Sequence, residues 1–489
     1  MNSLQNRQLK IQEKRKQTPR RDFLMDVASW VSIVLTKHGN SVTRYAEQRR
    51  WRHKTSWWYE DFVWELDENK IFFDAFTDLW QWVCKPMNIQ FGFVNENTQW
   101  ADQCFGAKNA YLTNNVWGWS ENVYYSTDVY PSGSNVFNSA MVGQSENIYM
   151  SSNISKSFNI FYAKNITDCS DIFLSANLIG CSFCINCNEL TNASYCVDNK
   201  QVSKEEFEHA KVALLRKWDD FLTEQYAALK ATNINSKNCT WKGLLHCEDL
   251  VNWLRCKRIT SWRNCVIWDA GDKAQNCYDV VNFGIQVQDY YGVALGGIDS
   301  EHVYCSSQLS SSSHIYYSYH LENCSFCLGC IWLKNKSYCI LNKQYTKEER
   351  YEKVDEIFSQ MEQDGTLGEF FPATMNPFYF NDTAAYLIDP SFTKEEVTAK
   401  WYLRRDEPIK VDIPEDAVVV KSSDLDQFEW FDPEWNWTIN AEVLKQVIQD
   451  EQWNFYRIIP MEYKFLVKHW LPLPRKHWLE RIKENFRIN

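Results

Sequence analysis

The chain has 489 residues, of which 16% are aromatic, and its formal net charge is −11. This length has room for several domains or one long repeat body, and a composition with 23 Trp excludes an intrinsically disordered protein. There is no apolar run of about 18 residues and no apolar signal segment, so the sequence predicts neither a membrane span nor secretion. We therefore expect a cytoplasmic, reducing location, where the 17 cysteines are thiols or metal ligands rather than disulfides.

Basic residues gather at both ends of the chain. Residues 1–54 contain 13 Lys and Arg against 4 Asp and Glu, and residues 464–489 contain 7 against 2. The remainder is acidic and should repel nucleic acid, so any phosphate contact would come from these two ends. The alternative is that the charges only solvate helix faces. Residues 1–21 are predicted to form a basic tail.

Residues 22–100 are rich in tryptophan, with Trp51, Trp57, Trp58, Trp64, Trp80 and Trp82. Phe76 and Trp80 have helical spacing, which favours a helical cap. The same tryptophans lie near arginines in residues 49–52 and could instead stack nucleic-acid bases.

A six-residue pattern repeats through residues 122–181. Asn or Asp precedes an aliphatic residue, and a small residue follows three places later, as in Asn147-Ile148-x-x-Ser151. This alternation is typical of a β-solenoid, whose aliphatic side chains fill the bore. Asn and Asp suit the bend before each strand because they tolerate the left-handed conformation. We therefore predict a solenoid unit over residues 101–232.

Aromatic residues follow the aliphatic in every second hexad, at Tyr124, Phe137, Tyr149, Phe161 and Phe173. This doubling predicts a coil of about twelve residues that adds one rung of ~4.8 Å and stacks the aromatics into a ladder. A coil of about 24 residues is the alternative.

Four cysteines occur twice at one spacing, and the second set lies 143 residues after the first. They are Cys181, Cys184, Cys187 and Cys196, then Cys324, Cys327, Cys330 and Cys339. The hexad phase also continues from Val303 to Leu321, so residues 233–370 are predicted as a second, duplicated solenoid unit. His302, His314 and His320 take the Asn places of this unit, either as polar rim residues or as metal ligands.

The cysteines fall on the inward phase of the hexads, so each set of four could converge. Four thiolates form the usual closed zinc site, which would stabilise an end coil that has no next coil to pack on. We predict two structural zinc ions per chain, one per set. The alternatives are inert core thiols and an iron–sulfur cluster.

A helix should follow each cysteine set. Ser203 with Glu206, and Thr346 with Glu349, have the spacing of capping boxes. The helices are expected to end near residues 231 and 361 and to lie across the end of each solenoid, where they would shield its open edge. The predicted fold class is mainly β with α caps, in two duplicated short-coil β-solenoid units.

Residues 371–489 are predicted as an α+β region. They include Asn381-Asp382 and the segment Leu471-Pro-Leu-Pro474. With Trp57-Trp58 and the cysteine sets followed by Asn-Lys-Gln, these segments resemble a group of uncharacterised cysteine-rich repeat proteins of candidate-phyla bacteria and associated mobile or viral genomes. In that group a CxxC zinc ribbon follows Leu-Pro-Leu-Pro, and no cysteine stands there in this chain. The resemblance covers most of residues 55–489 and implies a zinc-bearing repeat body, without an activity.

No motif for a hydrolase nucleophile, a phosphate loop, a zinc protease or a dinucleotide site occurs. The sequence therefore predicts a non-catalytic zinc-binding β-solenoid scaffold that interacts with a protein partner or self-assembles, as in a virion. One alternative is a nucleic-acid-associated protein that uses its basic termini. The other is a β-helix glycan-active enzyme, because its carboxylates would need only spatial proximity.

Overall fold

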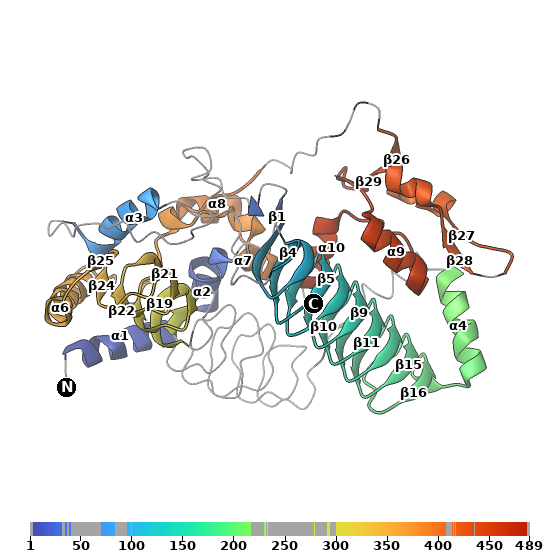
Figure 1. Cartoon of the computed structure of the whole chain (residues 1–489), viewed down its shortest axis with the longest axis horizontal. Helices are drawn as coiled ribbons and strands as arrows, with labels where there is room; N and C mark the ends of the chain where they lie inside the picture. The colour runs from blue at the N-terminus through green and yellow to red at the C-terminus, as the bar shows by residue number, and fades with distance from the viewer. Residues whose placement is uncertain are drawn as a thin grey trace. The chain divides into compact units, whose positions relative to one another are not determined.

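The computed structural model describes residues 3–31, 35–36, 39–40, 70–83, 95–98, 100–216, 229–230, 232, 278, 291–293, 300–406, 413, 415, 417–434 and 436–486 (Figure 1). The chain divides into two compact units. The first solenoid unit comprises Leu35–Lys37, Asn88–Thr232 and Asp406–Asn489, and the second comprises Met1–Val34, His38–Met87 and Asn233–Arg405. The C-terminal region thus belongs with the first repeat, and most of the N-terminal region belongs with the second.

The first solenoid unit contains the short strand β1 (Leu35–Thr36) and a 15-stranded sheet that winds as successive coils (Figure 1). The strands of this sheet are β3 (Trp100–Phe105), β4 (Lys108–Trp117), β5 (Glu121–Tyr124), β6 (Thr127–Val129), β7 (Ser134–Phe137), β8 (Ala140–Gly143), β9 (Glu146–Tyr149), β10 (Ser152–Ser155), β11 (Phe158–Phe161), β12 (Lys164–Thr167), β13 (Ser170–Phe173), β14 (Ala176–Ile179), β15 (Ser182–Ile185), β16 (Ser194–Val197) and β17 (Lys200–Gln201).

The register of these strands gives the coil length. Ile148 pairs with Ile160, and Ile160 pairs with Ile172, all in parallel strands and twelve residues apart. Val123 pairs with Val136, which is thirteen residues away, because this coil contains one residue more than the others named here. The twelve-residue coil is confirmed, and the coil of 24 residues is excluded for this solenoid.

The bends arise from a regular backbone conformation. From Ser132 to Asp198, every third residue has a positive φ. Three residues per bend and twelve residues per coil give a four-sided coil. Asn and Asp hold many of these places because they tolerate the left-handed region better than other residues with a side chain. The Asn and Asp that open the hexads lie within the strands, as Asn147 does in β9, whereas others, such as Asn138, lie between two strands.

The bore is filled by aliphatic residues and serines. Ile148, Ile160 and Ile172 are fully buried. A serine such as Ser139 donates its hydroxyl to the carbonyl of Phe137 (2.7 Å) and accepts the N–H of Ser151 in the next coil (3.1 Å). Its polar group is therefore satisfied inside the core, which explains why small polar residues recur there.

The aromatic ladder of the first unit is present, and a C-terminal helix covers it. The rings of Tyr124 and Phe137 stack at 5.0 Å. Phe465 of α9 (Pro460–His469) packs against Phe137 (4.7 Å) and Phe161 (6.2 Å), and α9 lies alongside the coils (Figure 1). The C-terminal region also contains β26 (Val419–Lys421), η5 (Ser422–Phe428), β27 (Glu429–Phe431), β28 (Trp437–Ile439), η6 (Ala441–Lys445), β29 (Val447–Gln449), β30 (Phe455–Tyr456) and α10 (Trp478–Phe486).

A buried ion pair joins these helices to the coils. Glu462 of α9 accepts from Arg481 of α10 (2.6 Å), Asn138 (2.8 Å) and Tyr149 (3.0 Å). Glu462 and Arg481 are almost fully buried, and burial raises the pKa of the Tyr149 phenol well above its usual value. Because a buried charge is costly without its partner, this cluster specifies where the C-terminal region docks.

The second solenoid unit carries an 8-stranded sheet. Its strands are β18 (Tyr291–Val293), β19 (Glu301–Ser310), β20 (Ser313–Tyr316), β21 (Tyr319–Glu322), β22 (Ser325–Leu328), β23 (Ile331–Lys334), β24 (Cys339–Ile340) and β25 (Lys343–Gln344). Val303 pairs with Ile315, again at twelve residues. Tyr291, Tyr304 and Tyr316 stack at 5.2 and 4.9 Å, so this unit also has an aromatic ladder.

Helices cover the second unit. They are α1 (Ser3–Gln17), α2 (Arg20–Asp26), η1 (Ala28–Trp30), α3 (Phe72–Trp82), α6 (Lys347–Gln363), η3 (Ala373–Met375), η4 (Phe380–Asp382), α7 (Ala384–Ile388) and α8 (Lys394–Ala399), with the short strand β2 (Gly39–Asn40). Gln8 of α1 donates to Tyr316 of the ladder (2.5 Å). Trp80 of α3 packs edge-on against Trp30 (5.4 Å), in agreement with the predicted helical cap. Trp51, Trp57, Trp58 and Trp64 lie outside the described residues.

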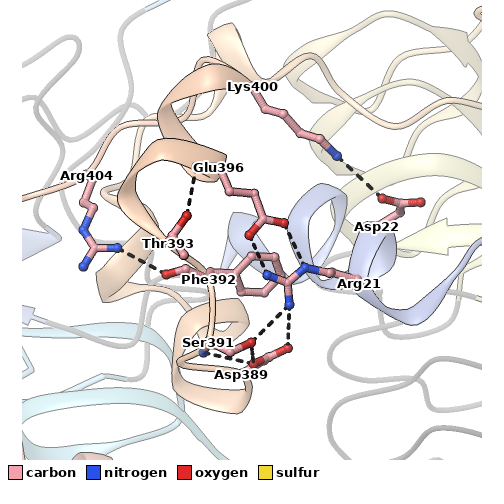
Figure 2. A network of polar contacts seen from close by, with 9 residues as sticks. All are labelled: Arg21, Asp22, Asp389, Ser391, Phe392, Thr393, Glu396, Lys400 and Arg404. Carbon is pink, nitrogen blue, oxygen red and sulfur yellow. Dashed lines mark hydrogen bonds and ion pairs between the residues drawn. The ribbon is translucent and has the colours of Figure 1, made fainter.

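The predicted basic tail is a helix whose charges have acidic partners. In α1, Arg7 pairs with Asp355 and Lys14 with Glu369 (3.3 Å). Figure 2 shows Arg21 of α2 bound to Glu396 of α8 and to Asp389 (3.2 Å). At the other end, Arg475 pairs with Glu429 (2.8 Å). The segment that the sequence predicts as a basic tail is thus mainly helical, and several of its cations lie beside acidic residues.

The helix after each cysteine set begins at a capping box. Before α4 (Lys204–Arg216), the N–H of Ser203 donates to the Glu206 carboxylate (2.7 Å) and the N–H of Glu206 donates to the Ser203 hydroxyl (3.2 Å). Thr346 and Glu349 make the same pair of bonds at the start of α6. Phe207 of α4 packs on the outer rings of Phe183 (5.8 Å) and Tyr195 (6.0 Å). The described part of α4 thus contacts the side of the last coils, and antiparallel β17 pairs with β16 at the solenoid end. The expected continuation of this helix, residues 217–228 and 231, lies outside the described residues.

Candidate thiol clusters

The cysteines of both sets point into the bore because they continue the serine and aliphatic phases of the coils. Cys184 pairs with Ile172 on one side and with Cys196 on the other. Cys187 accepts the N–H of Asn199 at its sulfur (3.4 Å) and donates to the carbonyl of Ile185 (3.3 Å). A thiol can therefore replace a bore serine without loss of the hydrogen bonds between coils.

The four thiols of the first set meet at Cys184. Its thiol contacts those of Cys181 and Cys187, which lie three residues away on either side. It also contacts the thiol of Cys196 in the next coil. All four residues are buried. These contacts bring together the four residues that the sequence predicts as metal ligands, and their role as ligands stays a prediction.

The second set has the same arrangement around Cys327. This thiol contacts Cys324, Cys330 and Cys339, and all four are buried. Each thiol of this set also donates to the carbonyl two residues before it, at 3.4 to 3.6 Å. The two sets thus place four sulfurs in one small volume in the same way.

Contacts between the thiols shift their pKa values in opposite directions. The hydrogen bond with Cys181 raises the pKa of the central Cys184, and the hydrogen bond with Cys184 lowers the pKa of Cys187. In the second set, the bond with Cys327 lowers the pKa of Cys324, and the same bond raises the pKa of Cys327.

The donor set suits zinc in number and chemistry, since four soft thiolates are its usual structural ligands. The positions of the sulfurs do not suit zinc, because the sulfur of Cys184 or Cys327 lies in contact with the other three, where the ion would have to lie. In the described part of the chain, no group of three or more His, Cys, Asp or Glu side chains is placed to hold a metal ion. Binding zinc would require the central Cys184 or Cys327 to turn away from its neighbours.

The three histidines of the second unit do not converge. The rings of His302 and His314 lie 4.7 Å apart and are tilted by 51°, whereas His320 stacks on Trp332 at 3.6 Å and is bonded to Gln308 (3.1 Å). His320 is buried, and burial lowers its pKa to about 3. It is therefore a neutral core residue and not the rim residue that the sequence suggested.

Two features escaped the sequence analysis. Cys169 contacts Cys181 one coil before the first set. Asparagines of successive coils also donate to one another, as Asn147 does to Asn159 (3.0 Å). The signal for these side-chain ladders was present, because Asn recurs every twelve residues, but the sequence analysis assigned the asparagines only to bends.

No family model matches the chain, and no curated protein and no solved structure matches it significantly. The resemblance to cysteine-rich repeat proteins therefore stays a prediction. Among the helices that the structure describes, none is long and apolar enough to cross a membrane.

Proposed function

We propose that the protein is a non-catalytic β-solenoid scaffold that binds polypeptide segments on the outer faces of its coils. The observation that carries this proposal is that two faces of the first solenoid already hold other segments of the same chain. The aromatic ladder holds α9 through Phe465. Another face holds Lys230 and Thr232 through Asn165 and Asn177.

The solenoid suits this role because its coils repeat the same groups at a fixed spacing. Hydrogen bonds between parallel strands and filled bore positions keep each coil in register with the next. A rigid surface loses little conformational entropy when a segment binds to it. A component of a larger assembly, such as a virion, would use the surface in this way.

Chemical cross-linking of the tagged, intact chain in its native cells tests the scaffold proposal. Lys108 and Lys156 are exposed on the first solenoid, and we expect them to cross-link to peptides of a co-purifying protein. The control is a chain with an unfolded first solenoid, such as Ile160→Asp, which should lose these cross-links. A protein that purifies alone, with no intermolecular cross-link to either lysine, would contradict the proposal.

The proposal includes one structural zinc ion in each thiol cluster. It is supported by the convergence of four thiols in both units, at Cys184 and at Cys327. Zinc would bring four thiolates together and stabilise the last coil of each solenoid.

Elemental analysis of the purified chain tests this part. We expect about two zinc ions per chain, about one after Cys184→Ser, and no change after the control Cys169→Ser. Cys169 is a suitable control because Ser157 occupies the same place in the preceding coil, where its hydroxyl accepts the N–H of Cys169 (3.1 Å). Absence of metal, with all eight cluster thiols freely titratable in the folded chain, would leave them as core residues.

A further inference from the structure

The first solenoid shows how its asparagines bind a polypeptide backbone. Asn165 donates to the carbonyl of Thr232 (3.0 Å), and Asn177 donates to the carbonyl of Lys230 (2.9 Å). The Asn177 amide oxygen also accepts the N–H of Thr232 (2.6 Å). Lys164 adds a bond to the carbonyl of Leu229 (3.0 Å). Every one of these four bonds reaches the main chain of residues 229–232, so the binding does not depend on their side chains.

The same asparagines also bind each other along the solenoid. Asn165 donates to the amide oxygen of Asn177 (2.9 Å), and Asn177 donates to that of Asn188 (2.7 Å). An asparagine has two N–H donors. One therefore joins successive coils, and the other binds the polypeptide.

A second ladder runs along a different column of the same solenoid, and we call it the open ladder. It consists of Asn97, Asn109, Asn122, Asn135, Asn147, Asn159 and Asp171. Each asparagine donates to the next residue of the ladder, at 2.9 to 3.0 Å. Among the described residues this is the one hydrogen bond that each of these amide nitrogens donates, which leaves its second N–H for a ligand.

The open ladder is accessible at its N-terminal end. Asn97 is exposed, and Asn109, Asn122 and Asn135 on the next three coils are partly exposed, whereas Asn147 is buried. Four successive coils thus present an amide of the kind that Asn165 and Asn177 use to hold residues 229–232.

Charge beside the open ladder favours a basic ligand. The residue before each of the first five ladder asparagines is Glu96, Lys108, Glu121, Ser134 and Glu146 in turn, and Phe158 precedes Asn159. Lys108 and Glu121 lie 3.7 Å apart and neutralise each other. Glu96 and Glu146 remain as two exposed carboxylates, which attract Lys or Arg and repel phosphate.

We propose that the open ladder, from Asn97 to Asn135, binds an extended basic segment of a partner polypeptide through its main-chain carbonyls. This inference rests on the proposed scaffold function and assigns it a surface and a ligand chemistry. Basic side chains of the segment lie next to Glu96 and Glu146, and its carbonyls accept from the second N–H of successive asparagines.

Selection from a phage-displayed library of random peptides, with the intact chain as bait, tests the proposal. Synthetic versions of enriched peptides are then measured by fluorescence anisotropy against the wild type and two variants. Asn122→Gly removes one ladder amide and keeps its backbone, because Asn122 has φ 56° and glycine adopts this conformation freely. Gln144→Gly is the matched control, since Gln144 has φ 50°, is exposed and also loses an amide, yet lies outside the ladder.

We expect enriched peptides to be rich in Lys and Arg, to bind Asn122→Gly about tenfold more weakly, and to bind Gln144→Gly like the wild type. Photo-cross-linking of the same peptides to the wild type should place them on residues 96–135, a readout that does not depend on the stability of a variant. Equal binding by Asn122→Gly, or cross-links elsewhere, would overturn the ladder assignment and leave the scaffold function standing. Failure to enrich any peptide would overturn this inference, whereas the scaffold function is judged by its own cross-linking experiment. Retention of a labelled single-stranded oligonucleotide that Asn122→Gly abolishes would replace the polypeptide by a nucleic acid.

Discussion

Replacing one bore residue should unfold the first solenoid, and Ile160→Asp is the sharpest form of this change. Ile160 is fully buried and stands between Ile148 and Ile172 of the adjacent coils. An aspartate at this place would face those aliphatic side chains and would have to be buried as a carboxyl group.

The magnitude follows from two contributions. Truncation of a buried isoleucine to alanine costs about 2–5 kcal/mol through lost contacts and a cavity. Burial of a carboxyl without a partner adds at least about 1–3 kcal/mol. Natural domains are stable by about 5–15 kcal/mol, so the sum removes much or all of the stability of this unit. Ile160→Val should cost only about 0.5–1.5 kcal/mol, because it removes one methyl group.

Hydrogen–deuterium exchange of the intact chain, followed by mass spectrometry, measures the effect unit by unit. In Ile160→Asp, peptides from residues 107–201 should lose protection, and peptides from residues 301–345 should keep it. The control Asp171→Asn should be almost silent, because Asp171 only accepts from Asn159 (2.9 Å) and an asparagine oxygen can do the same. Native protection in Ile160→Asp, or equal damage from Asp171→Asn, would refute the assignment of bore and ladder positions.

Three further predictions concern pH, the buried ion pair and nucleic acid. Burial lowers the pKa of His320 to about 3. Below the unfolded pKa of about 6.5, the unfolded chain therefore binds more protons than the folded one, and the free energy of unfolding falls by about 2 kcal/mol by pH 5. Urea unfolding at pH 7 and pH 5 should show a smaller difference in unfolding free energy for His320→Asn than for the wild type; an equal pH dependence in the two proteins would contradict the assignment. Arg481→Met should destabilise the first unit by about 3–5 kcal/mol, because it leaves the buried Glu462 without its cation, and adding Glu462→Gln should recover part of the loss in the same urea assay. Because Arg7 and Lys10 of α1 are paired with acidic residues of α6, we expect little retention of single-stranded DNA at 0.15 M salt, with or without residues 1–17. Tight, salt-sensitive binding that the deletion abolishes would favour the nucleic-acid alternative.

The repeat body was predictable because its determinants are local. Each coil is specified by residues within twelve positions of one another, so the spacing of Ile148, Ile160 and Ile172 already gives the coil length. The capping boxes at Ser203 and Thr346 were predictable for the same reason, since they involve residues only three apart. The burial of the cysteines in the bore was predictable from the inward phase of the hexads.

Tertiary structure alone decided what lies on the outer faces of the coils. Nothing near Tyr149 in the sequence indicates that Glu462, 313 residues away, will bond to it, or that Phe465 will cover the ladder. Charge counts likewise do not show which cations meet an acidic partner on folding. Only the tertiary structure shows that Lys14 lies beside Glu369. Periodicity fixes the bore because each coil repeats its neighbours' contacts, whereas the partners of an outer face come from any distance along the chain. The thiols of Cys184 and Cys327 lie between these cases: the sequence places them in the bore, and only the three-dimensional contacts show one sulfur standing among the other three.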